Sequence, residues 1–308
     1  MKNFRHLFLL FGLLAMTTLA CSLSGSDTGP PRNAAVVNVV ANSGLQPWLD
    51  TAVINFNDSD TETSDGKTVY VQLTGVESGQ AAANLAVDNE DNSLWIPDEL
   101  VWVNLLAEQG NSDFQNDCVS VAESPLVIGM WRPVAELLGW PSLPLGWLDI
   151  GSLAADPGLW NYYSGGEYGD SLRLSHTHPG LSGTGVSTLL AIVQAAESKA
   201  EAVSVDDIQQ PIVQASVGAF ESAVTWFSTS TDLLGSTMKE RGASYLGAAV
   251  MYESTAVYYG PGEIIPIYPL EGTFVATHPA CVNTNADSQT QEAASLFRDR
   301  RFFSVALP

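Results

Sequence analysis

A short pattern of strand, Ser/Gly turn and helix occurs at three places in this sequence. The clearest copy is the segment LRLSHTHPGLSGTGVSTLLAIVQA at residues 172–195. Its start is typical of a short strand, Ser182 and Thr184 stand where helix N-caps stand, and the apolar run that follows predicts a helix. The first N–H groups of a helix carry partial positive charge, so such a turn can hold an anion or a polar ligand atom. A hydroxyl in this position also caps helices that bind no ligand.

The same arrangement is repeated twice nearer the amino end. Ser43 lies in the turn NSG after the apolar, β-branched run AAVVNVVA at 34–41, and Ser78 lies in the turn ESGQ at 77–80 after another short strand pattern. Polar residues that follow parallel strands meet at the same edge of a sheet. The three copies therefore predict one polar cleft lined by helix starts. Its ligand-binding candidates are Ser43, Ser78, Ser182 and Thr184.

Strands and helices alternate along the first third of the chain, which is typical of an α/β fold with a parallel sheet. A length of 308 residues favours two domains or one domain with two lobes. The strands expected from the patterns lie at 34–41, 69–73, 91–97, 124–130, 245–250, 256–259 and 264–268. Residues 203–226 are expected to be mostly helical.

The charge balance excludes one class of partner. The formal net charge is −22, with 34 acidic and 12 basic residues. Binding to nucleic acid requires clustered Lys and Arg that neutralise phosphates, so no nucleic-acid partner is expected.

Residues 1–20 have the pattern of an export signal. Lys2 and Arg5 precede a short apolar run, which is too short for a stable membrane span. The sequence TLAC that ends at Cys21 resembles a bacterial lipobox, with Thr18 where leucine usually stands. That resemblance implies a lipid on Cys21, and plain secretion is the alternative. Residues 21–33 are expected to form a flexible tether. The mature chain is therefore expected outside the cytoplasmic membrane, anchored there by its lipid.

The two other cysteines, Cys118 and Cys281, form a pair if Cys21 carries a lipid. In an oxidising compartment they either form a disulfide or remain two buried thiols, and the sequence leaves both open.

Metal binding and catalysis have little support in the sequence. His176 and His178 lie two residues apart on an extended segment, so both rings point to one side, and a metal site with His278 or a carboxylate is one interpretation. Hydrogen bonding around the turn is the other, and we favour it. Ser182 lacks the G-x-S-x-G pattern of a catalytic serine elbow. We expect no enzyme activity and no cofactor.

Several segments together resemble a known family. In order along the chain they are ESPLVIGMWRPVAELLGWP from residue 123, GWLDI from 146, LRLSHTHPGLSGTG from 172 and IPIYPLEGTFVATHP from 265. They are similar to bacterial extracellular solute-binding proteins of the class II periplasmic-binding-protein fold. The similarity is greatest to the branch that includes molybdate-like binding proteins and relatives linked to von Willebrand A domains. The resemblance covers about residues 36–297.

This resemblance implies two α/β lobes with a ligand held between them. Lobe 1 is expected to comprise residues 34–125 and 262–308, and lobe 2 residues 126–261. Carried over by position, Ser43 and Ser78 contact the ligand from lobe 1, and Ser182 and Thr184 contact it from lobe 2. Tyr258 or Trp95 is expected to complete the wall of the pocket.

The function implied is capture of a small solute for an ABC-type transporter with a membrane permease and an ATPase. Hydroxyls and backbone N–H groups without a dominant cation suit a small oxyanion. Two alternatives remain open. One is a cell-surface interaction module that keeps the same fold as a scaffold for a von Willebrand A-type partner. The other is a metal-binding receptor that uses His176 and His178.

Overall fold

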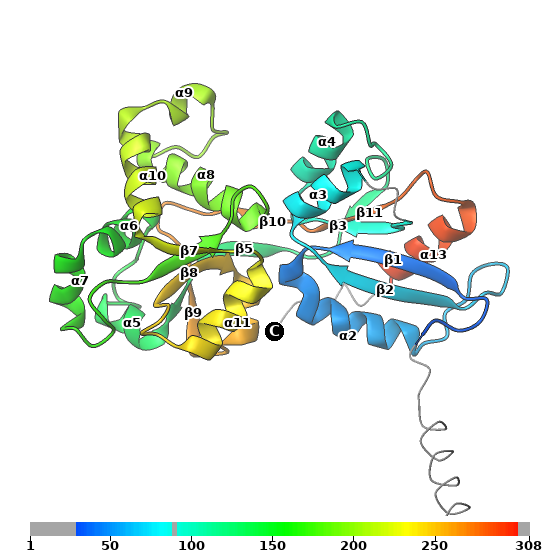
Figure 1. Ribbon diagram of the computed structural model, residues 1–308, viewed down its shortest axis with the longest axis horizontal. Helices are drawn as coiled ribbons and strands as arrows, with labels where there is room; N and C mark the ends of the chain where they lie inside the picture. Colours follow the sequence, from blue (N-terminus) through cyan, green and yellow to red (C-terminus); the bar gives the residue numbers. More distant parts are fainter. Residues whose placement is uncertain (1–28, 88–90, 301–308) are drawn as a thin grey trace, which may run out of the picture. The chain divides into compact units, whose positions relative to one another are not determined.

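A computed structural model describes residues 29–87 and 91–300 of the chain (Figure 1). The expected signal at 1–20, the lipidation candidate Cys21 and most of the expected tether lie outside the described residues. The α/β fold class predicted from the sequence is confirmed, because the chain forms two sheets, each flanked by helices.

The first sheet has five strands in the order β2-β1-β3-β11-β4. β1 runs parallel to β2 and β3, and β11 runs antiparallel to β3 and β4. The strands are β1 (Ala35–Ala41), β2 (Val69–Gly75), β3 (Leu94–Ile96), β4 (Cys118–Ser120) and β11 (Pro279–Val282). The helices of this half are η2 (Ser43–Leu45), α2 (Gln46–Asn57), α3 (Ser78–Val87), α4 (Leu100–Glu108) and α13 (Ser288–Arg298).

Both faces of the first sheet are covered, which explains why β1 is apolar on both sides. Val37 and Val39 belong to the core on the face of α2 and α13, whereas Val40 belongs to the core on the face of α3 and α4 (Figure 1). On the first face, the rings of Phe56 and Phe297 meet edge to face with centroids 5.1 Å apart. Helix α13 is therefore part of this core.

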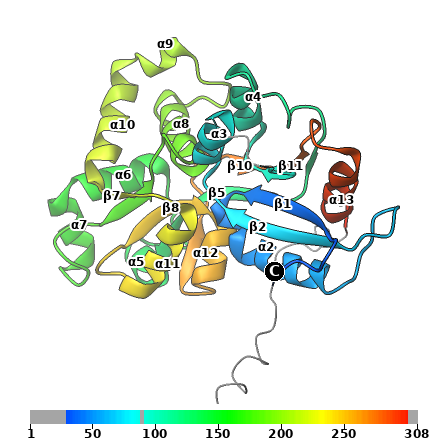
Figure 2. The ribbon, with the colours of Figure 1, turned by 45° about the vertical axis from the view of Figure 1, so that its right-hand side comes forward.

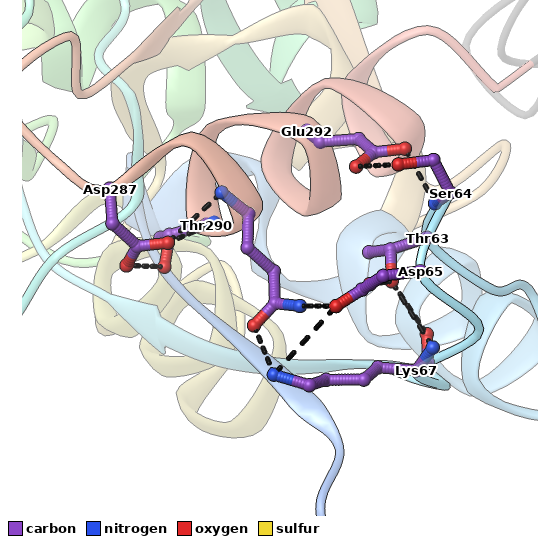
Figure 3. Close-up of polar contacts among 8 residues, drawn as sticks. Thr63, Ser64, Asp65, Lys67, Asp287, Thr290 and Glu292 are labelled. Atoms are coloured by element: carbon purple, nitrogen blue, oxygen red, sulfur yellow. Dashed lines mark hydrogen bonds and ion pairs between the residues drawn. The ribbon is translucent and has the colours of Figure 1, made fainter.

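Polar contacts also hold α13 against the 61–68 loop (Figure 3). Ser64 donates to both oxygens of Glu292, from its backbone N at 2.7 Å and from its hydroxyl at 2.9 Å. Asp287 caps the helix by accepting from the backbone N of Gln289 and Thr290. These exposed bonds fix the direction from which the helix enters the core.

The second sheet has six strands, in the order β10-β5-β8-β6-β7 with β9 paired beside β5. β5 is antiparallel to β8, β9 and β10, and β6 is parallel to β7 and β8. The strands are β5 (Ser124–Trp131), β6 (Leu174–Thr177), β7 (Val224–Ser228), β8 (Ala248–Tyr252), β9 (Ile264–Ile267) and β10 (Val275–Ala276). The helices are α5 (Arg132–Leu137), α6 (Trp147–Ala155), α7 (Pro157–Ser164), α8 (Gly183–Glu197), α9 (Val205–Ile208), α10 (Pro211–Ala223), α11 (Thr231–Arg241) and α12 (Glu253–Tyr259).

Two cores enclose the second sheet. The larger one joins β5 and β8 to α5, α6, α8 and α10 and contains Trp147, Trp160 and Phe220. The smaller one lies under α11 and α12, which run side by side in Figure 2, and contains Leu234 and Met238. Along the chain, β6 is followed by α8, β7 by α11 and β8 by α12, each after a short loop or directly.

The chain passes between the sheets twice. It leaves the first sheet after β4 and enters β5 at Ser124, and it returns between Ala276 of β10 and Pro279 of β11. The return of the chain to lobe 1 was expected at residue 262. In the structure, β9 and β10 follow that residue but still pair with β5 of the second sheet, so the chain returns later. At the return, the backbone N of Thr277 and of His278 both donate to the Asp98 carbonyl, at 3.2 and 3.1 Å.

Two expected elements differ from the structure. Residues 256–259 were expected to be a strand but belong to helix α12, since a short apolar run fits a buried helix as well as a strand. The helical expectation for 203–226 ends at Ala223, where the β-branched and aromatic residues VTWFS form β7 instead.

Within the described residues, no helix combines the length and the apolar character needed to cross a membrane.

Removing one ring of the edge-to-face pair tests the role of α13. We expect Phe297→Ala to lower the free energy of unfolding by about 3–5 kcal/mol, because the side chain is fully buried. Ile54→Ala, on the exposed face of α2, is the matched control and should change it by less than about 0.5 kcal/mol. Urea unfolding followed by circular dichroism measures both, and a loss below about 1 kcal/mol for Phe297→Ala would show that α13 is not part of the core.

Candidate functional site

The structure brings the three predicted turns together. Ser43, Ser78, Ser182 and Thr184 are all buried, although they follow three different strands: Ser43 follows β1, Ser78 follows β2, and Ser182 and Thr184 follow β6. The turn before α8 reaches the start of α3, where the Gln80 backbone N donates to the Leu181 carbonyl at 3.1 Å. With the polar side chains bound to them, these residues form what we call the polar cluster. Its members are Ser43, Glu77, Ser78, Asp98, Thr177, Ser182, Thr184, Thr231 and Tyr252.

Hydroxyl groups of the second half form one side of the polar cluster. Thr177 Oγ1 lies 2.9 Å from Ser182 Oγ and 2.6 Å from Thr184 Oγ1, and Ser182 and Thr184 are 2.7 Å apart. Thr184 reaches Thr231, the first residue of α11, at 3.1 Å. These hydroxyls therefore link the start of α8 to the start of α11.

Glu77 enters the cluster from the first half. Its Oε1 accepts from the Ser43 hydroxyl and from the backbone N of Thr231, the latter at 2.7 Å. Among the described residues, Oε2 has no hydrogen-bond partner. The carboxyl thus sits at the positive end of α11, where an anion is stabilised.

The protonation of Glu77 is set by opposing effects. Burial is the largest and raises its pKa, whereas the nearby Ser182 hydroxyl and the hydrogen bonds from Ser43 and the Thr231 backbone lower it, and the charge of Asp98 raises it. The effect of Ser182 comes from its proximity, because the well-formed hydrogen bonds of this hydroxyl run to Thr177 and Thr184. Together these effects raise the pKa of Glu77 above its ordinary value.

Asp98 is the second buried carboxyl, placed just after β3. Its backbone N donates to Ser78 Oγ at 3.0 Å, and its Oδ2 accepts from the Tyr252 hydroxyl at 2.8 Å. A Cβ atom at Gly183, the first residue of α8, would collide with this carboxylate, so only glycine fits there. Oδ1 has no hydrogen-bond partner within the described part of the chain, and burial raises the pKa of the group.

The return crossover is bound to the same segment. Glu99 follows Asp98 and accepts from Thr277 Oγ1 at 3.5 Å; burial and the neighbouring charge of Asp98 raise its pKa to about 7. His278 is fully buried, and its ring packs edge to face on Tyr252 with centroids 5.5 Å apart. Burial lowers the pKa of His278 to about 3, so its ring is neutral, and the nearby Pro97 carbonyl opposes this only partly.

A cavity of about 460 Å³ opens on the polar cluster. Ser43 and Glu77 line it from the first half, and Leu181, Thr229 and Ser230 line it from the second. A small molecule in this cavity therefore reaches the polar cluster at Ser43 and Glu77, whereas Ser78, Ser182 and Thr184 lie behind them, fully buried.

The remaining pocket candidates lie elsewhere. Tyr258 is on α12 with 59% of its surface exposed, and it lines a different cavity of about 760 Å³. Trp95 is fully buried in the core of the first sheet, where its ring meets Phe114. Neither residue joins the polar cluster.

The histidine pair has local partners. His176 is buried, its Nδ1 lies 2.8 Å from the Thr177 carbonyl oxygen and its Nε2 lies 2.8 Å from Glu221 Oε1. His178 Nδ1 accepts from the backbone N of Gly180 at 3.0 Å. In the part of the chain that the structure describes, no three His, Cys, Asp or Glu side chains are arranged to hold a metal ion.

The two cysteines left open by the sequence form a disulfide in the structure. Cys118 and Cys281 are direct partners in the antiparallel pairing of β4 and β11. The disulfide therefore joins the strand before the first crossover to the strand after the return.

Sequence reasoning missed the two carboxyls and Thr231. Glu77 stands in the turn ESGQ next to Ser78, and Asp98 follows a predicted strand. Both positions are visible in the sequence as strand ends, but their burial depends on segments far away along the chain.

The sequence matches no protein-family model, and no curated protein sequence matches it either. The fold does match solved structures. The sulfate-binding protein SubI from Mycobacterium tuberculosis H37Rv is 17% identical, with 88% of this chain and 82% of that chain covered and a TM-score of 0.60. The periplasmic binding protein AfuA from Actinobacillus pleuropneumoniae, with fructose-6-phosphate bound, is 14% identical, with coverages of 86% and 78% and a TM-score of 0.59.

A third match is the ferric binding protein from Campylobacter jejuni. It is 10% identical, with 87% of this chain and 80% of that chain covered and a TM-score of 0.53. All three are binding proteins. The chain therefore has the fold of periplasmic binding proteins, and at these identities the fold is what is shared.

The raised pKa of Glu99 predicts a specific dependence of stability on pH. A carboxyl with a raised pKa in the folded state favours folding while it is protonated, below its unfolded value near 4.5, and this contribution is lost as the pH rises to about 7. We expect Glu99→Gln to become more stable relative to the wild type across this interval. Thermal unfolding at pH 4.5, 6 and 8 measures the difference. The exposed Glu108→Gln is the control, and a difference between Glu99→Gln and wild type that stays constant with pH would contradict the assignment.

Proposed function

We propose that this chain is the solute-binding protein of an ABC-type transport system and holds a small solute at the polar cluster. The observation that carries the proposal is the meeting of the starts of η2, α3, α8 and α11 around buried hydroxyls, beside a cavity of about 460 Å³ that Ser43 and Glu77 line. Fixed donors and acceptors in a buried site bind a small molecule more strongly than the same groups in water do. Ser43, Ser78, Ser182 and Thr184 are its proposed contacts.

The cluster favours a solute that brings its own hydrogen-bond donors. Glu77 Oε2 and Asp98 Oδ1 are buried acceptors without partners among the described residues, and leaving such an atom unpaired costs free energy. A solute O–H or N–H directed at these two oxygens removes that cost. Sugars, amines and oxyanions that keep a proton all meet this condition.

The small oxyanion expected from the sequence meets this condition only if it carries a proton. Hydroxyls and helix starts favour an anionic ligand. Two solved structures of this fold are also named for anionic ligands, a sulfate and a sugar phosphate. In this chain, however, Glu77 already accepts from the start of α11, and Asp98 lies against the start of α8. A fully ionised oxyanion here would face two carboxyls, so we propose that only a protonated oxyanion binds.

The proposal places the chain outside the cytoplasmic membrane. A signal at residues 1–20 would direct export, a lipid on Cys21 would anchor the chain, and residues 21–33 would act as the tether. The partners are then a membrane permease and an ATPase. No reaction is proposed, because the proteins of this fold named above bind their ligands.

One observation favours a second candidate. The protein's own carboxyls already fill the helix starts, so the two halves can be held together without any solute. A chain of this kind would serve as a cell-surface interaction module, with a von Willebrand A-type protein as partner.

A thermal-shift screen of the purified full-length chain tests the first candidate. The probes are sulfate, inorganic phosphate, fructose 6-phosphate, neutral sugars, amino acids and divalent metal ions. We expect at least one solute with O–H or N–H donors to raise the melting temperature and sulfate to leave it unchanged, because only binding to the folded state shifts melting.

Variants then locate the bound solute. Ser43→Ala and Ser182→Ala should each weaken its binding roughly two- to twelvefold, the equivalent of about 0.5–1.5 kcal/mol for one hydrogen bond. Ser222→Ala, on the exposed side of α10, should leave it unchanged. If no solute shifts the melting temperature, the interaction module is favoured instead. Binding that survives both cluster variants would show that the solute lies elsewhere.

A further inference from the structure

A second, larger cavity lies beside the first crossover and has no role in the function proposed above. We call this space of about 760 Å³ the crossover cavity. It is lined from the first half by the start of α2, from the second half by α12 and Asp232, and between them by residues 121–124. Its size is that of a pocket for a small organic ligand.

The charge of the crossover cavity has one sign. Three carboxylates line it, those of Glu123, Asp232 and Glu253, and all its lining residues belong to the described part of the chain. None of these lining residues is Lys, Arg or His. An anion would therefore meet only repulsion here, and a cation would be attracted.

The two deeper carboxylates are held in place by tyrosines. Tyr259 donates its hydroxyl to Asp232 Oδ1, and Tyr268 donates to Glu253 Oε1. One oxygen of each group is thus fixed by a neighbour, which orients the carboxylate beside the cavity. Fixed charges of this kind bind a ligand with little reorganisation.

Aromatic and apolar side chains form the rest of the wall. Trp48, Tyr258 and Tyr259 line the cavity together with Leu45, Pro47 and Val257. The rings of Tyr258 and Tyr259 meet at 88° with centroids 5.0 Å apart, so they present surfaces of different orientation. Aromatic faces attract organic cations, and the apolar residues suit a ligand with a hydrocarbon body.

A buried hydroxyl gives an independent indication of a ligand. Thr255 is only 3% exposed, and its Oγ1 has no hydrogen-bond partner among the described residues. Its methyl group faces Gly235 of α11, whereas its hydroxyl faces Gly44, which lines the crossover cavity. An N–H or O–H donor in the cavity would satisfy this oxygen.

We propose that the crossover cavity binds a small organic monocation, an ammonium with a compact apolar body. Carboxylates neutralise its charge, the aromatic faces contact it, and Thr255 accepts from its N–H. A bare metal ion is not proposed, since no three ligating side chains are grouped within the described residues. Because Gly44–Trp48 and α12 belong to different halves of the fold, the bound cation contacts both. The proposal does not depend on the solute site at the polar cluster.

Three probes of similar shape and different charge test it on the full chain. They are 2-phenylethylammonium, neutral 2-phenylethanol and anionic phenylacetate, titrated calorimetrically at pH 7 and 0.15 M salt. We expect saturable binding of the ammonium, at least roughly tenfold weaker binding of the alcohol and none of the acid anion. Absence of ammonium binding, equal binding of the alcohol or preferred binding of phenylacetate would each overturn the proposal.

Variants place the cation in the cavity. Glu253→Gln and Tyr258→Ala should each weaken ammonium binding roughly fivefold or more, and the exposed position of Tyr258 makes its variant compatible with folding. Tyr162→Ala, a tyrosine that is 82% exposed on α7, is the matched control and should not change the affinity. Ser182→Ala separates the two sites, because it affects only a solute at the polar cluster. Unchanged ammonium affinity in both cavity variants would overturn the placement.

Discussion

Two carboxyl groups buried between the two halves of the fold determine how the rest of the polar cluster is arranged. Glu77 accepts from the backbone of α11, and Asp98 accepts from Tyr252 at the end of β8. A buried carboxyl that loses such a partner keeps the full cost of its desolvation. The protonation of Glu77 and Asp98 is therefore coupled to the contacts that these two carboxyls make between the halves.

Asp98 carries this coupling to the backbone. Its carbonyl holds Thr277 and His278 at the return crossover, while its carboxylate holds Tyr252 and lies against the start of α8. One residue therefore contacts the crossover, the second sheet and the helix that follows β6. A movement of the second half relative to the first has to break the bond between Tyr252 and the Asp98 carboxylate.

The sequence predicted those members of the polar cluster whose placement depends on local pattern. Ser43, Ser78, Ser182 and Thr184 were found because a strand, a turn and a helix start are encoded by neighbouring residues. The partners of the two carboxyls were not, since Glu77 and Thr231, like Asp98 and Tyr252, are 154 residues apart. Tyr258 was expected at the pocket as part of a strand, but the helix α12 places it in the crossover cavity.

Acidic side chains belong both to the polar cluster and to the wall of the crossover cavity. At physiological ionic strength, charges beyond about 8 Å are largely screened, so the net charge of −22 alone discriminates little between solutes at contact distance. The buried carboxyls of Glu77 and Asp98 in the polar cluster are screened much less, whereas Asp232 and Glu253 beside the crossover cavity are only partly buried. In this chain, Glu77 accepts from the start of α11, and Asp98 lies against the start of α8. The fold thus supplies the arrangement of helix starts, whereas the side chains of Glu77 and Asp98 would decide which solutes the proposed site accepts.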